Sequence, residues 1–436
     1  MTLTSRPAPA LSGEARAPAD KSISHRALIL GAMAKGETRI ANLLEGEDVL
    51  RTASALRALG AEVERTGGRW HVAGGPWRAP TRPLYCGNAG TGARLLMGAV
   101  AGRGVPAAFM GDQSLSARPM LRITDPLEAM GAKARTRDGA MPVALDAAAL
   151  RGIDYALPKP SAQIKSAVLL AGLGADGVTR VTEPVPVRDH TERMLAGFGA
   201  PPLIEELEEG AKRITVRGGT RLRPAELTVP ADPSSAAFPV VAAAVRPGSR
   251  VRLPGVLANP RRTGLLAVLR RMGARIEESN LRNTGGEVVC DLEVTGAALG
   301  ATDVTPGEVP DMIDEIPVLC VAAAFARGTS RIEGLAELRV KESDRLAATF
   351  DMLSANGVLV AKGRDWLEVT GGIVLGGGTV EARHDHRIAM SAMVLGAGAQ
   401  APVTVDDAGP IATSFPGFAD LMNGLGARIG DARIES

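Results

Sequence analysis

A helix-ending signature occurs six times along this chain of 436 residues. Each time, an amphipathic run of residues ends in a glycine, and a short segment that often alternates between apolar and polar residues follows. Glycine is common just beyond a helix C-terminus because it adopts the left-handed backbone conformation without strain. The spacing of these glycines, between 68 and 84 residues, predicts six similar units. The glycines are Gly60, Gly131, Gly199, Gly273, Gly357 and Gly426.

A second helix is predicted upstream of each glycine, and its sequence is more uniformly apolar. Such a helix belongs in the interior of a protein. Most of these helices are followed by a glycine and a β-branched strand, as in Gly177 to Val181. Each unit therefore predicts the order strand, buried helix, strand, amphipathic helix and two strands, or βαβαββ. The six buried helices are predicted at residues 23–34, 91–102, 163–173, 235–245, 316–326 and 387–397.

The tripeptide Pro-Ala-Asp occurs at residues 18–20 and again at 230–232, three units later. The chain is also longer than one hydrophobic core usually serves. We therefore predict an α/β fold of two similar domains, each with three βαβαββ repeats, joined by a two-strand hinge. The first domain would span 18–229, and 1–17 together with 230–436 would form the second. The hinge crossovers would lie near 17–21 and 229–233.

The composition argues against several classes of protein. The net charge is only +2 and no long block of like charge occurs, which argues against a general nucleic-acid binder or a polybasic membrane surface. No long uncharged apolar run is present, and the start of the chain lacks the apolar core of a signal peptide. The three cysteines, Cys86, Cys290 and Cys320, form neither a disulfide framework nor a zinc pattern. We expect a soluble, cytoplasmic protein.

Polar and cationic residues gather where the buried helices are predicted to begin. A helix N-terminus offers unpaired N–H groups and a partial positive charge, so several such termini facing one cleft would attract phosphate or carboxylate. The alternative is that each serine, asparagine or aspartate is an ordinary helix cap. Nearby cations favour the interpretation as an anion site. They are Lys21, Arg26, Arg118, Lys165, Arg188, Lys341, Arg345 and Arg387.

Carboxylates also collect before the fifth buried helix, at Asp311, Asp314 and Glu315. The helix dipole accounts for one or two of them, and a third near apolar surroundings is a candidate general acid or base. The charged segment 338–345 precedes an amphipathic helix, and its alternative interpretation is a charged helix start with Glu342 and Arg345 paired. The two histidines around residue 385 lack further histidines nearby, so we predict no metal site.

Six motifs in this sequence resemble those of the enolpyruvyl transferases, most closely the branch that acts on 3-phosphoshikimate. The resemblance covers essentially the whole chain, with the motifs in the family's order. It implies two domains of three βαβαββ units, of the inside-out α/β barrel type, which close around the substrates by hinge motion. The motifs lie at residues 20–26, 87–92, 118–120, 161–166, 339–345 and 385–387.

The resemblance implies transfer of the enolpyruvyl (1-carboxyvinyl) group of phosphoenolpyruvate to the 5-hydroxyl of 3-phosphoshikimate, with release of phosphate. This reaction belongs to the shikimate pathway, which leads to chorismate and the aromatic amino acids. The family uses no metal or cofactor and is the target of glyphosate. The resemblance further implies a cytoplasmic monomer whose partners are its small-molecule substrates, without nucleic acid or membrane.

The same resemblance assigns roles to residues by their position in the motifs. Asp314 would take the proton of the 5-hydroxyl, while Glu342 and Lys21 would serve proton transfer at the enolpyruvyl carbons. The residues implied to bind 3-phosphoshikimate are Lys21, Ser22, Arg26, Ser161, Ala162, Gln163, Arg188, Asp314 and Lys341. Those implied to bind phosphoenolpyruvate are Lys21, Gly90, Arg118, Gln163, Arg345 and Arg387.

One stretch departs from the family's pattern. Many members carry a lysine near the C-terminus in a Lys-Thr-Phe-Pro context that contacts phosphoenolpyruvate, whereas residues 412–416 here read Ala-Thr-Ser-Phe-Pro. Two alternatives remain open. The cell-wall relative that acts on a UDP-amino sugar commonly uses a cysteine in the loop before Arg-Pro, and loop 111–118 has none. A non-catalytic binder of anions or RNA ends on the same fold would not need Asp314 and Glu342.

Overall fold

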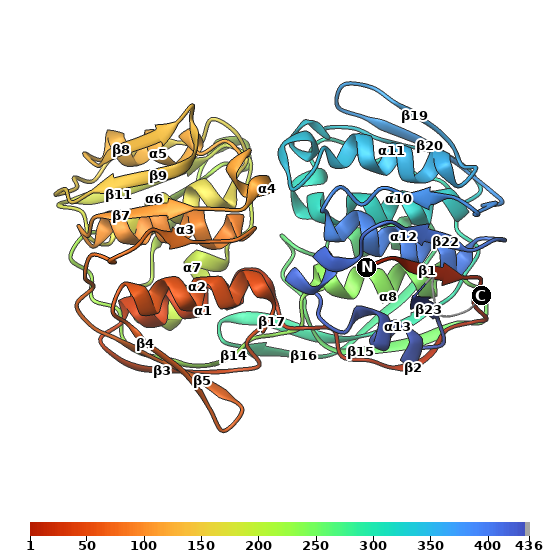
Figure 1. The fold of residues 1–436 in the computed structure, drawn as a ribbon, viewed down its shortest axis with the longest axis horizontal. Coiled ribbons are helices and arrows are strands. Elements are labelled where there is room, and N and C mark those ends of the chain that lie inside the picture. The colour runs from red at the N-terminus through yellow and green to blue at the C-terminus, as the bar shows by residue number, and fades with distance from the viewer. Residues whose placement is uncertain (432–436) are drawn as a thin grey trace. The chain divides into compact units, whose positions relative to one another are not determined.

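The computed structural model describes residues 1–431 (Figure 1). The chain divides into two compact units. The unit that we call the N-terminal unit comprises residues 21–229 and 283–287, and the C-terminal unit comprises residues 1–20, 230–282 and the chain from 288 onwards. Within residues 1–431, no helix is both long enough and apolar enough to span a bilayer.

The N-terminal unit contains three βαβαββ repeats, which confirms the predicted order of elements. The first consists of β14 (Glu226–Thr228), α1 (Lys21–Met33), β3 (Gly36–Ala41), α2 (Glu47–Ala58), β4 (Glu62–Thr66) and β5 (Arg69–Gly74). The second consists of β6 (Leu84–Tyr85), α3 (Gly90–Gly102), β7 (Ala107–Met110), α5 (Leu121–Ala129), β8 (Lys133–Arg137) and β9 (Ala140–Asp146). The third consists of β10 (Asp154–Ala156), α6 (Ala162–Gly172), β11 (Val178–Glu183), α7 (His190–Gly197), β12 (Leu203–Glu206) and β13 (Lys212–Arg217).

The C-terminal unit follows the same plan with its own strands. Its first repeat consists of β2 (Ser12–Glu14), α8 (Pro233–Ala244), β15 (Arg250–Leu257), α9 (Gly264–Arg271), β16 (Arg275–Thr284) and β17 (Glu287–Thr295). Its second consists of α10 (Ile316–Phe325), β18 (Gly328–Ile332), α11 (Arg345–Ala355), β19 (Leu359–Lys362) and β20 (Leu367–Gly371). Its third consists of β21 (Thr379–Val380), α12 (His386–Gly398), β22 (Val403–Val405), α13 (Phe418–Gly424), β23 (Arg428–Asp431) and β1 (Leu3–Arg6).

Short helical segments connect these elements. They are α4 (Gln113–Ser116) and the 3-10 turns η1 (Glu208–Gly210), η2 (Val309–Asp311), η3 (Ile313–Glu315), η4 (Ala336–Val340) and η5 (Gly409–Thr413).

All the four-stranded sheets share one strand order. The first strand of a repeat lies parallel to the second, the second lies antiparallel to the fourth, and the third is at the other edge, as in β6-β7-β9-β8. Two repeats borrow strands from distant parts of the chain. β2 lies beside β15, and β1 lies between β22 and β23. The first residues of the chain therefore complete two sheets of the C-terminal unit.

One predicted strand does not form as a strand. The repeat that contains α10 has a three-stranded sheet, because the segment before α10 makes only isolated bridges, at Gly300 to Arg327 and at Val304 to Ile332. This segment contains Gly300, Pro306 and Gly307. Proline cannot donate to a strand ladder, and glycine weakens one, so the pairing is interrupted.

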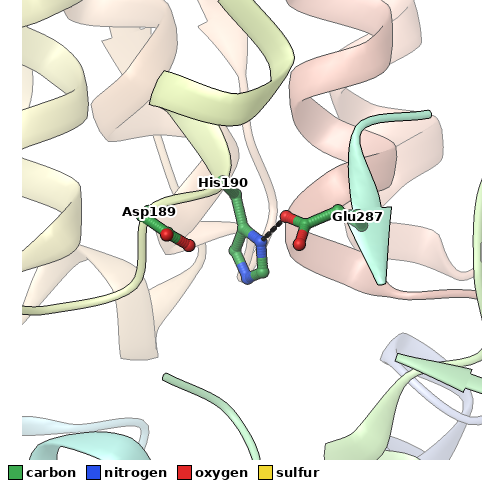
Figure 2. A group of neighbouring side chains, drawn as sticks. All are labelled: Asp189, His190 and Glu287. Carbon is green, nitrogen blue, oxygen red and sulfur yellow. Dashed lines mark hydrogen bonds and ion pairs between the residues drawn. The ribbon is translucent and has the colours of Figure 1, made fainter. Parts of the chain in front are cut away.

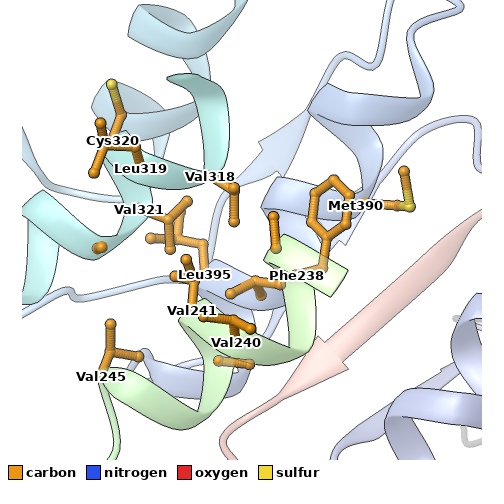
Figure 3. Packing of buried hydrophobic residues seen from close by; sticks show 14 of the residues in the cluster. Phe238, Val240, Val241, Val245, Val318, Leu319, Cys320, Val321, Met390 and Leu395 are labelled. Carbon is orange, nitrogen blue, oxygen red and sulfur yellow. The ribbon is translucent and has the colours of Figure 1, made fainter. Parts of the chain in front are cut away.

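The uniformly apolar helices form the interior of each unit, as predicted. In the C-terminal unit α8, α10 and α12 pack against one another, and Figure 3 shows Phe238, Val241, Val318, Val321 and Leu395 from these helices side by side. In the N-terminal unit α3 packs against α1 and α6. All three cysteines are buried and form no disulfide.

The packing of α3 on α6 is unusually close. A Cβ atom on Gly98 would lie 2.2 Å from the carbonyl oxygen of Ala167, so only glycine fits at this position. Close packing of the two helix backbones also brings their first turns together, and these turns carry several of the motif residues. A local packing requirement thus contributes directly to the geometry of the candidate site.

The six helix-ending glycines have the predicted role. Their φ angles lie between +76° and +104°, a region that favours glycine. At each of them the glycine N–H donates to the carbonyl three residues earlier, and the next N–H donates to the carbonyl five residues before it, as in Gly426 to Asn423 and Ala427 to Met422. This pair of hydrogen bonds is the Schellman motif, which satisfies the last carbonyls of a helix.

We predict that Gly426→Ala destabilises the protein by about 1–2 kcal/mol, because φ at this position is +104° and an L-residue is strained there. Gly424→Ala is the matched control. Gly424 is the last residue of α13, and a Cβ there meets no atom within 4 Å. This control should be neutral or stabilising by up to about 1 kcal/mol. Thermal unfolding of both variants measures the difference, and equal Tm values would contradict the role assigned to Gly426.

Candidate active site

The first two turns of the three buried helices of the N-terminal unit meet at one place. Gln163 in α6 donates through Nε2 to Thr91 Oγ1 in α3, at 2.9 Å. Arg26 in α1 donates through Nη2 to Ser166 Oγ in α6, at 2.8 Å. Three helix N-termini therefore converge with their partial positive charges, and such an arrangement favours anions.

Arg26 is buried in the second turn of α1 and is held by neutral oxygens. Its Nε donates to Thr191 Oγ1 at 2.7 Å and its Nη1 to the carbonyl of Ser22 at 3.0 Å. Lys21, at the start of the same helix, donates through Nζ to Asp48 Oδ2 at 3.1 Å. Both cationic groups are fixed by the fold, so they can bind an anion with little further loss of side-chain freedom.

Gly90 is the first residue of α3 and lies against Arg118. A Cβ atom on Gly90 would lie 2.8 Å from Arg118 Nη1. The guanidinium of Arg118 is itself held by the side chain of Asn88 and by Ser114 Oγ, the latter at 3.1 Å. The missing side chain of Gly90 therefore makes room for a buried arginine at a helix N-terminus.

Ser161, Ala162 and Gln163 form the start of α6. Ser161 caps the helix, since its Oγ accepts from the Ile164 N–H at 3.4 Å, and Ala162 is the first helical residue. Gln163 is held at both ends of its amide, because Arg94 Nη1 donates to its Oε1 at 2.6 Å. Ser161 can therefore cap α6 while the same helix start also serves as an anion site.

Lys165 does not have the environment expected of an anion-binding cation. Its side chain is fully buried and pairs with Glu183 at 2.8 Å and Glu192 at 2.5 Å. Burial alone would lower the pKa of Lys165, but the two carboxylates outweigh it and raise that pKa. Lys165 is therefore an internal cation that joins α6 to the start of α7, not a residue that offers its charge to a substrate.

Arg188 lies just before α7, next to a polar cluster of Asp189, His190 and Glu287 (Figure 2). Potential ligand atoms of these three residues lie within 4.8 Å of one another. However, His190 Nδ1 and Glu287 Oε1 are hydrogen-bonded at 2.7 Å, and Arg193 pairs with Asp189 at 2.9 Å and with Glu287 at 3.6 Å. The cluster is an internal network that fixes the start of α7 beside Arg188.

The C-terminal unit gathers a second set of motif residues around Arg345, the first residue of α11. Arg345 is buried, and its guanidinium pairs with Asp314 at 3.1 Å, Glu342 at 2.6 Å and Asp385 at 2.8 Å. Burial would lower the pKa of Arg345, and the three carboxylates raise it instead. Asp385 is the cap of α12 and accepts from the Arg387 N–H at 2.9 Å. The first turns of α11 and α12 are thereby joined.

Asp314 accepts from two cations. Lys341 Nζ lies 3.4 Å from Asp314 Oδ1, and Arg345 Nη1 lies 3.1 Å from the same atom. These two contacts fix the position of the Asp314 carboxylate. Arg387 follows Asp385, the cap of α12, by two residues and pairs with the buried Glu315 at 3.5 Å. The predicted pairing of Glu342 with Arg345 is confirmed, although Glu342 precedes the helix cap Asp344.

The motif residues thus fall into two sets, one in each unit. The N-terminal unit contains Lys21, Ser22, Arg26, Gly90, Arg118, Ser161, Ala162, Gln163 and Arg188. The C-terminal unit contains Asp314, Lys341, Glu342, Arg345 and Arg387.

Several residues that hold these sets in place were not predicted as site residues, although Asn88 and Asp385 lie within the motifs. Asp48, Asn88, Arg94 and Asp385 make direct hydrogen bonds to Lys21, Arg118, Gln163 and Arg345. The sequence could have indicated a role for Arg94, because a charged residue inside an apolar helix needs a partner. The sequence could not have indicated a role for Asp48, because acidic residues are common in the first turn of a helix such as α2.

The chain matches the family model described as EPSP synthase (3-phosphoshikimate 1-carboxyvinyltransferase) over residues 6–422. A protein named 3-phosphoshikimate 1-carboxyvinyltransferase from Afipia carboxidovorans is 57% identical to this chain and covers 98% of it and 99% of the relative. A relative of the same name from Acidiphilium cryptum is 55% identical and covers 97% of this chain and 96% of the relative.

Solved structures agree with these sequence relatives. An EPSP synthase from Acinetobacter baumannii has a TM-score of 0.86 at 41% identity and covers 99% of this chain and 100% of that chain. The enolpyruvyl transferase NikO from Streptomyces tendae has a TM-score of 0.77 at 21% identity over 98% of both chains, and this likeness supports the fold alone. The resemblance noted from the six motifs is confirmed.

We predict that His25 makes the protein less stable as the pH falls. His25 is buried, and burial together with Lys21 and Arg26 lowers its pKa from 6.5 to about 3. Between these two pH values the unfolded chain binds a proton that the folded chain does not. The free energy of unfolding therefore decreases by up to about 1.4 kcal/mol for each pH unit in this window.

His25→Asn keeps a polar partner for Thr52, which lies 2.8 Å from His25 Nδ1, and removes the titrating group. The variant should show a shallower loss of stability than the wild type between pH 6 and pH 4, as measured by denaturant unfolding at each pH. Protonation of carboxylates in this pH range changes the stability of both proteins equally, so it cancels in the comparison. Identical pH slopes would show that His25 does not titrate differently in the two states.

Proposed function

The chain belongs to the EPSP synthase family, and we propose that it transfers the enolpyruvyl group of phosphoenolpyruvate to the 5-hydroxyl of 3-phosphoshikimate and releases phosphate. The observation that carries this proposal is the convergence of three helix N-termini on Arg26, Arg118 and Gln163. Both substrates carry phosphate and carboxylate groups, so they repel each other in water. Fixed cations and helix termini offset this repulsion and hold the reacting groups in place.

For 3-phosphoshikimate, we assign Ser22 and Arg26 to the carboxylate. The phosphate is assigned to Ser161, Ala162, Arg188 and Lys341, and Gln163 to the face of the ring. The first turn of α6 supports this assignment, because Ser161 and Ala162 present a capped helix N-terminus of the kind that binds phosphate. Charge-assisted hydrogen bonds of this kind contribute roughly 1.5–3 kcal/mol each.

For phosphoenolpyruvate, we assign the phosphate to Lys21, Gly90, Arg118 and Gln163. Arg345 and Arg387 are assigned to its carboxylate. Arg345 already pairs with Asp314, Glu342 and Asp385, so the substrate carboxylate binds beside these partners or replaces one of them. Asp385 is fully buried and bonds two nitrogens of the guanidinium, and it therefore keeps Arg345 oriented during the exchange.

The reaction proceeds by addition and then elimination. The 5-hydroxyl oxygen bonds to C2 of phosphoenolpyruvate and gives its proton to Asp314, while C3 receives a proton from Glu342 or Lys21. In the tetrahedral intermediate the phosphate is still bound to C2. C3 then returns a proton to the same groups, and the C2–O bond to phosphate breaks with its electron pair on the leaving phosphate. No metal, cofactor or second protein takes part, and the enzyme acts as a cytoplasmic monomer.

Release of phosphate by the purified protein tests the proposal directly. With phosphoenolpyruvate and 3-phosphoshikimate together, phosphate should appear, and with either compound alone it should not. Turnover only with UDP-N-acetylglucosamine as acceptor would identify the cell-wall reaction instead. Binding of both anions without any turnover would favour the non-catalytic alternative.

We predict that Asp314→Asn lowers kcat by about 10²–10⁴, the usual effect of losing a general acid or base. Binding of 3-phosphoshikimate, measured by calorimetry, should change little because the amide keeps the shape of the side chain. Asp311→Asn is the control. Asp311 lies in the same segment but pairs with Arg261 at 3.3 Å, so this variant should retain its turnover. Full turnover of Asp314→Asn would remove Asp314 from the mechanism.

We also predict that Gly90→Ala weakens inhibition by glyphosate by a larger factor than it raises KM for phosphoenolpyruvate. The new methyl would lie 2.8 Å from Arg118 Nη1, so it must displace the guanidinium or the ligand that meets it. Glyphosate is slightly longer than the substrate and has less room to adapt. Gly197→Ala, where a Cβ meets no atom within 4 Å, is the control. Equal changes in both constants would show that the methyl does not discriminate by length.

A further inference from the structure

The repeated tripeptide Pro-Ala-Asp pairs with its own copy. Ala19 and Ala231 form an antiparallel bridge. The Asp20 N–H donates to the carbonyl of Pro230, and the Asp232 N–H donates to the carbonyl of Pro18, both at 2.8 Å. The two segments therefore bind each other through identical, reciprocal hydrogen bonds.

Arg262 joins the two aspartates of these tripeptides. Its Nη1 lies 2.8 Å from Asp20 Oδ2, and its Nη2 lies 2.8 Å from Asp232 Oδ1. Nη2 also donates to Ser234 Oγ at 3.0 Å. Arg262 and both aspartates are buried, so their charges depend on one another for compensation. We call Arg262, Asp20 and Asp232 the crossover triad.

The two aspartates are alike in their contacts, but they precede helices with different roles. Asp232 caps α8, accepting from the Ser234 N–H at 2.8 Å, and none of the residues assigned to a substrate lies on that helix. Asp20 immediately precedes α1, whose first residues are Lys21 and Ser22. Lys21 is assigned to the phosphate of phosphoenolpyruvate and Ser22 to the carboxylate of 3-phosphoshikimate. The triad thus fixes the backbone from which a substrate-binding helix starts.

We propose that Arg262 is a positioning residue for the reaction, because it holds Asp20 and thereby sets the first turn of α1 with Lys21 and Ser22. This inference rests on the proposed function, but the position of α1 can be measured without turnover. The two copies of Pro-Ala-Asp then have one structural role, which is to place two carboxylates beside Arg262. Of the two aspartates, only Asp20 immediately precedes a helix with residues assigned to the substrates.

Removing Arg262 outright is a poor test, because it would leave two buried carboxylates without a counter-charge. The chain offers a better pair, Asp20→Asn and Asp232→Asn. Each variant removes one charge of the triad and leaves Arg262 with the other aspartate. Asparagine keeps the size of the side chain and remains a good helix cap at the start of α8, so each variant changes charge and not volume.

Kinetics distinguish positioning from a general loss of stability. For Asp20→Asn we expect kcat/KM for 3-phosphoshikimate to fall by about 10 to 10², in line with a small displacement of a reacting group. Asp232→Asn should keep kcat and both KM values close to those of the wild type. Thermal unfolding confirms that both variants are folded. Equal kinetics in the two variants would overturn the proposal.

Hydrogen exchange gives a readout that does not depend on activity. The amides of residues 25–28 donate to carbonyls of the first turn of α1, so they report directly on that turn. They should exchange faster in Asp20→Asn than in either Asp232→Asn or the wild type. If the wild type shows no turnover, the proposed function fails while this comparison still decides whether the triad positions α1. Unchanged exchange in Asp20→Asn would overturn the positioning role.

Arg262→Lys provides a second variant if Asp20→Asn does not fold. Lysine keeps the positive charge between the carboxylates but lacks the two-pronged geometry of the guanidinium. We expect the same faster exchange at residues 25–28 and the same fall in kcat/KM. Wild-type values for both quantities in a folded Arg262→Lys protein would show that charge compensation alone is required, and the positioning role would be wrong.

Discussion

The buried helices are apolar along almost their whole length, and this single constraint determines where polar chemistry can occur. α10, for example, contains no charged residue between Ile316 and Phe325 and is buried from Ile316 to Ala324. The polar side chains of such helices gather in the first two turns, close to the N–H groups that lack partners within the helix and must find side chains or ligands. Residues that bind anions therefore collect at these turns. The βαβαββ repeat places such a turn in every repeat, so a functional site could develop without disturbing the core.

The two units hold their arginines in different ways. Arg26 donates to the hydroxyl groups of Thr191 and Ser166, whereas Arg345 pairs with three carboxylates. At about 4 Å, two opposite unit charges attract each other by about 4 kcal/mol in an environment of intermediate polarity. Arg345 is therefore held by opposite charges, whereas Arg26 is held by neutral oxygens.

Much of the architecture followed from sequence periodicity, because the six glycines and six apolar helices are local features. Contacts between segments that are distant in the sequence could not be predicted from this periodicity. Lys165 illustrates the limit: it lies two residues after Gln163, and residues two apart on a helix point in different directions. No local pattern shows that this direction leads to Glu183 and Glu192. The absence of the first strand before α10 was also not predicted. Glycine and proline interrupt this segment, but its position in the repeat still implied a strand.

The buried cysteines have a practical consequence. Burial raises the pKa of Cys86 and Cys320 to about 12 and, with nearby carboxylates, that of Cys290 to about 11. All three thiols are therefore protonated at neutral pH and shielded from reagents, and the thiolate is the reactive form. A cysteine introduced on the surface would react selectively in the otherwise native protein. One dye or spin label could then be attached to each unit, and the distance between the units could be followed as substrates bind.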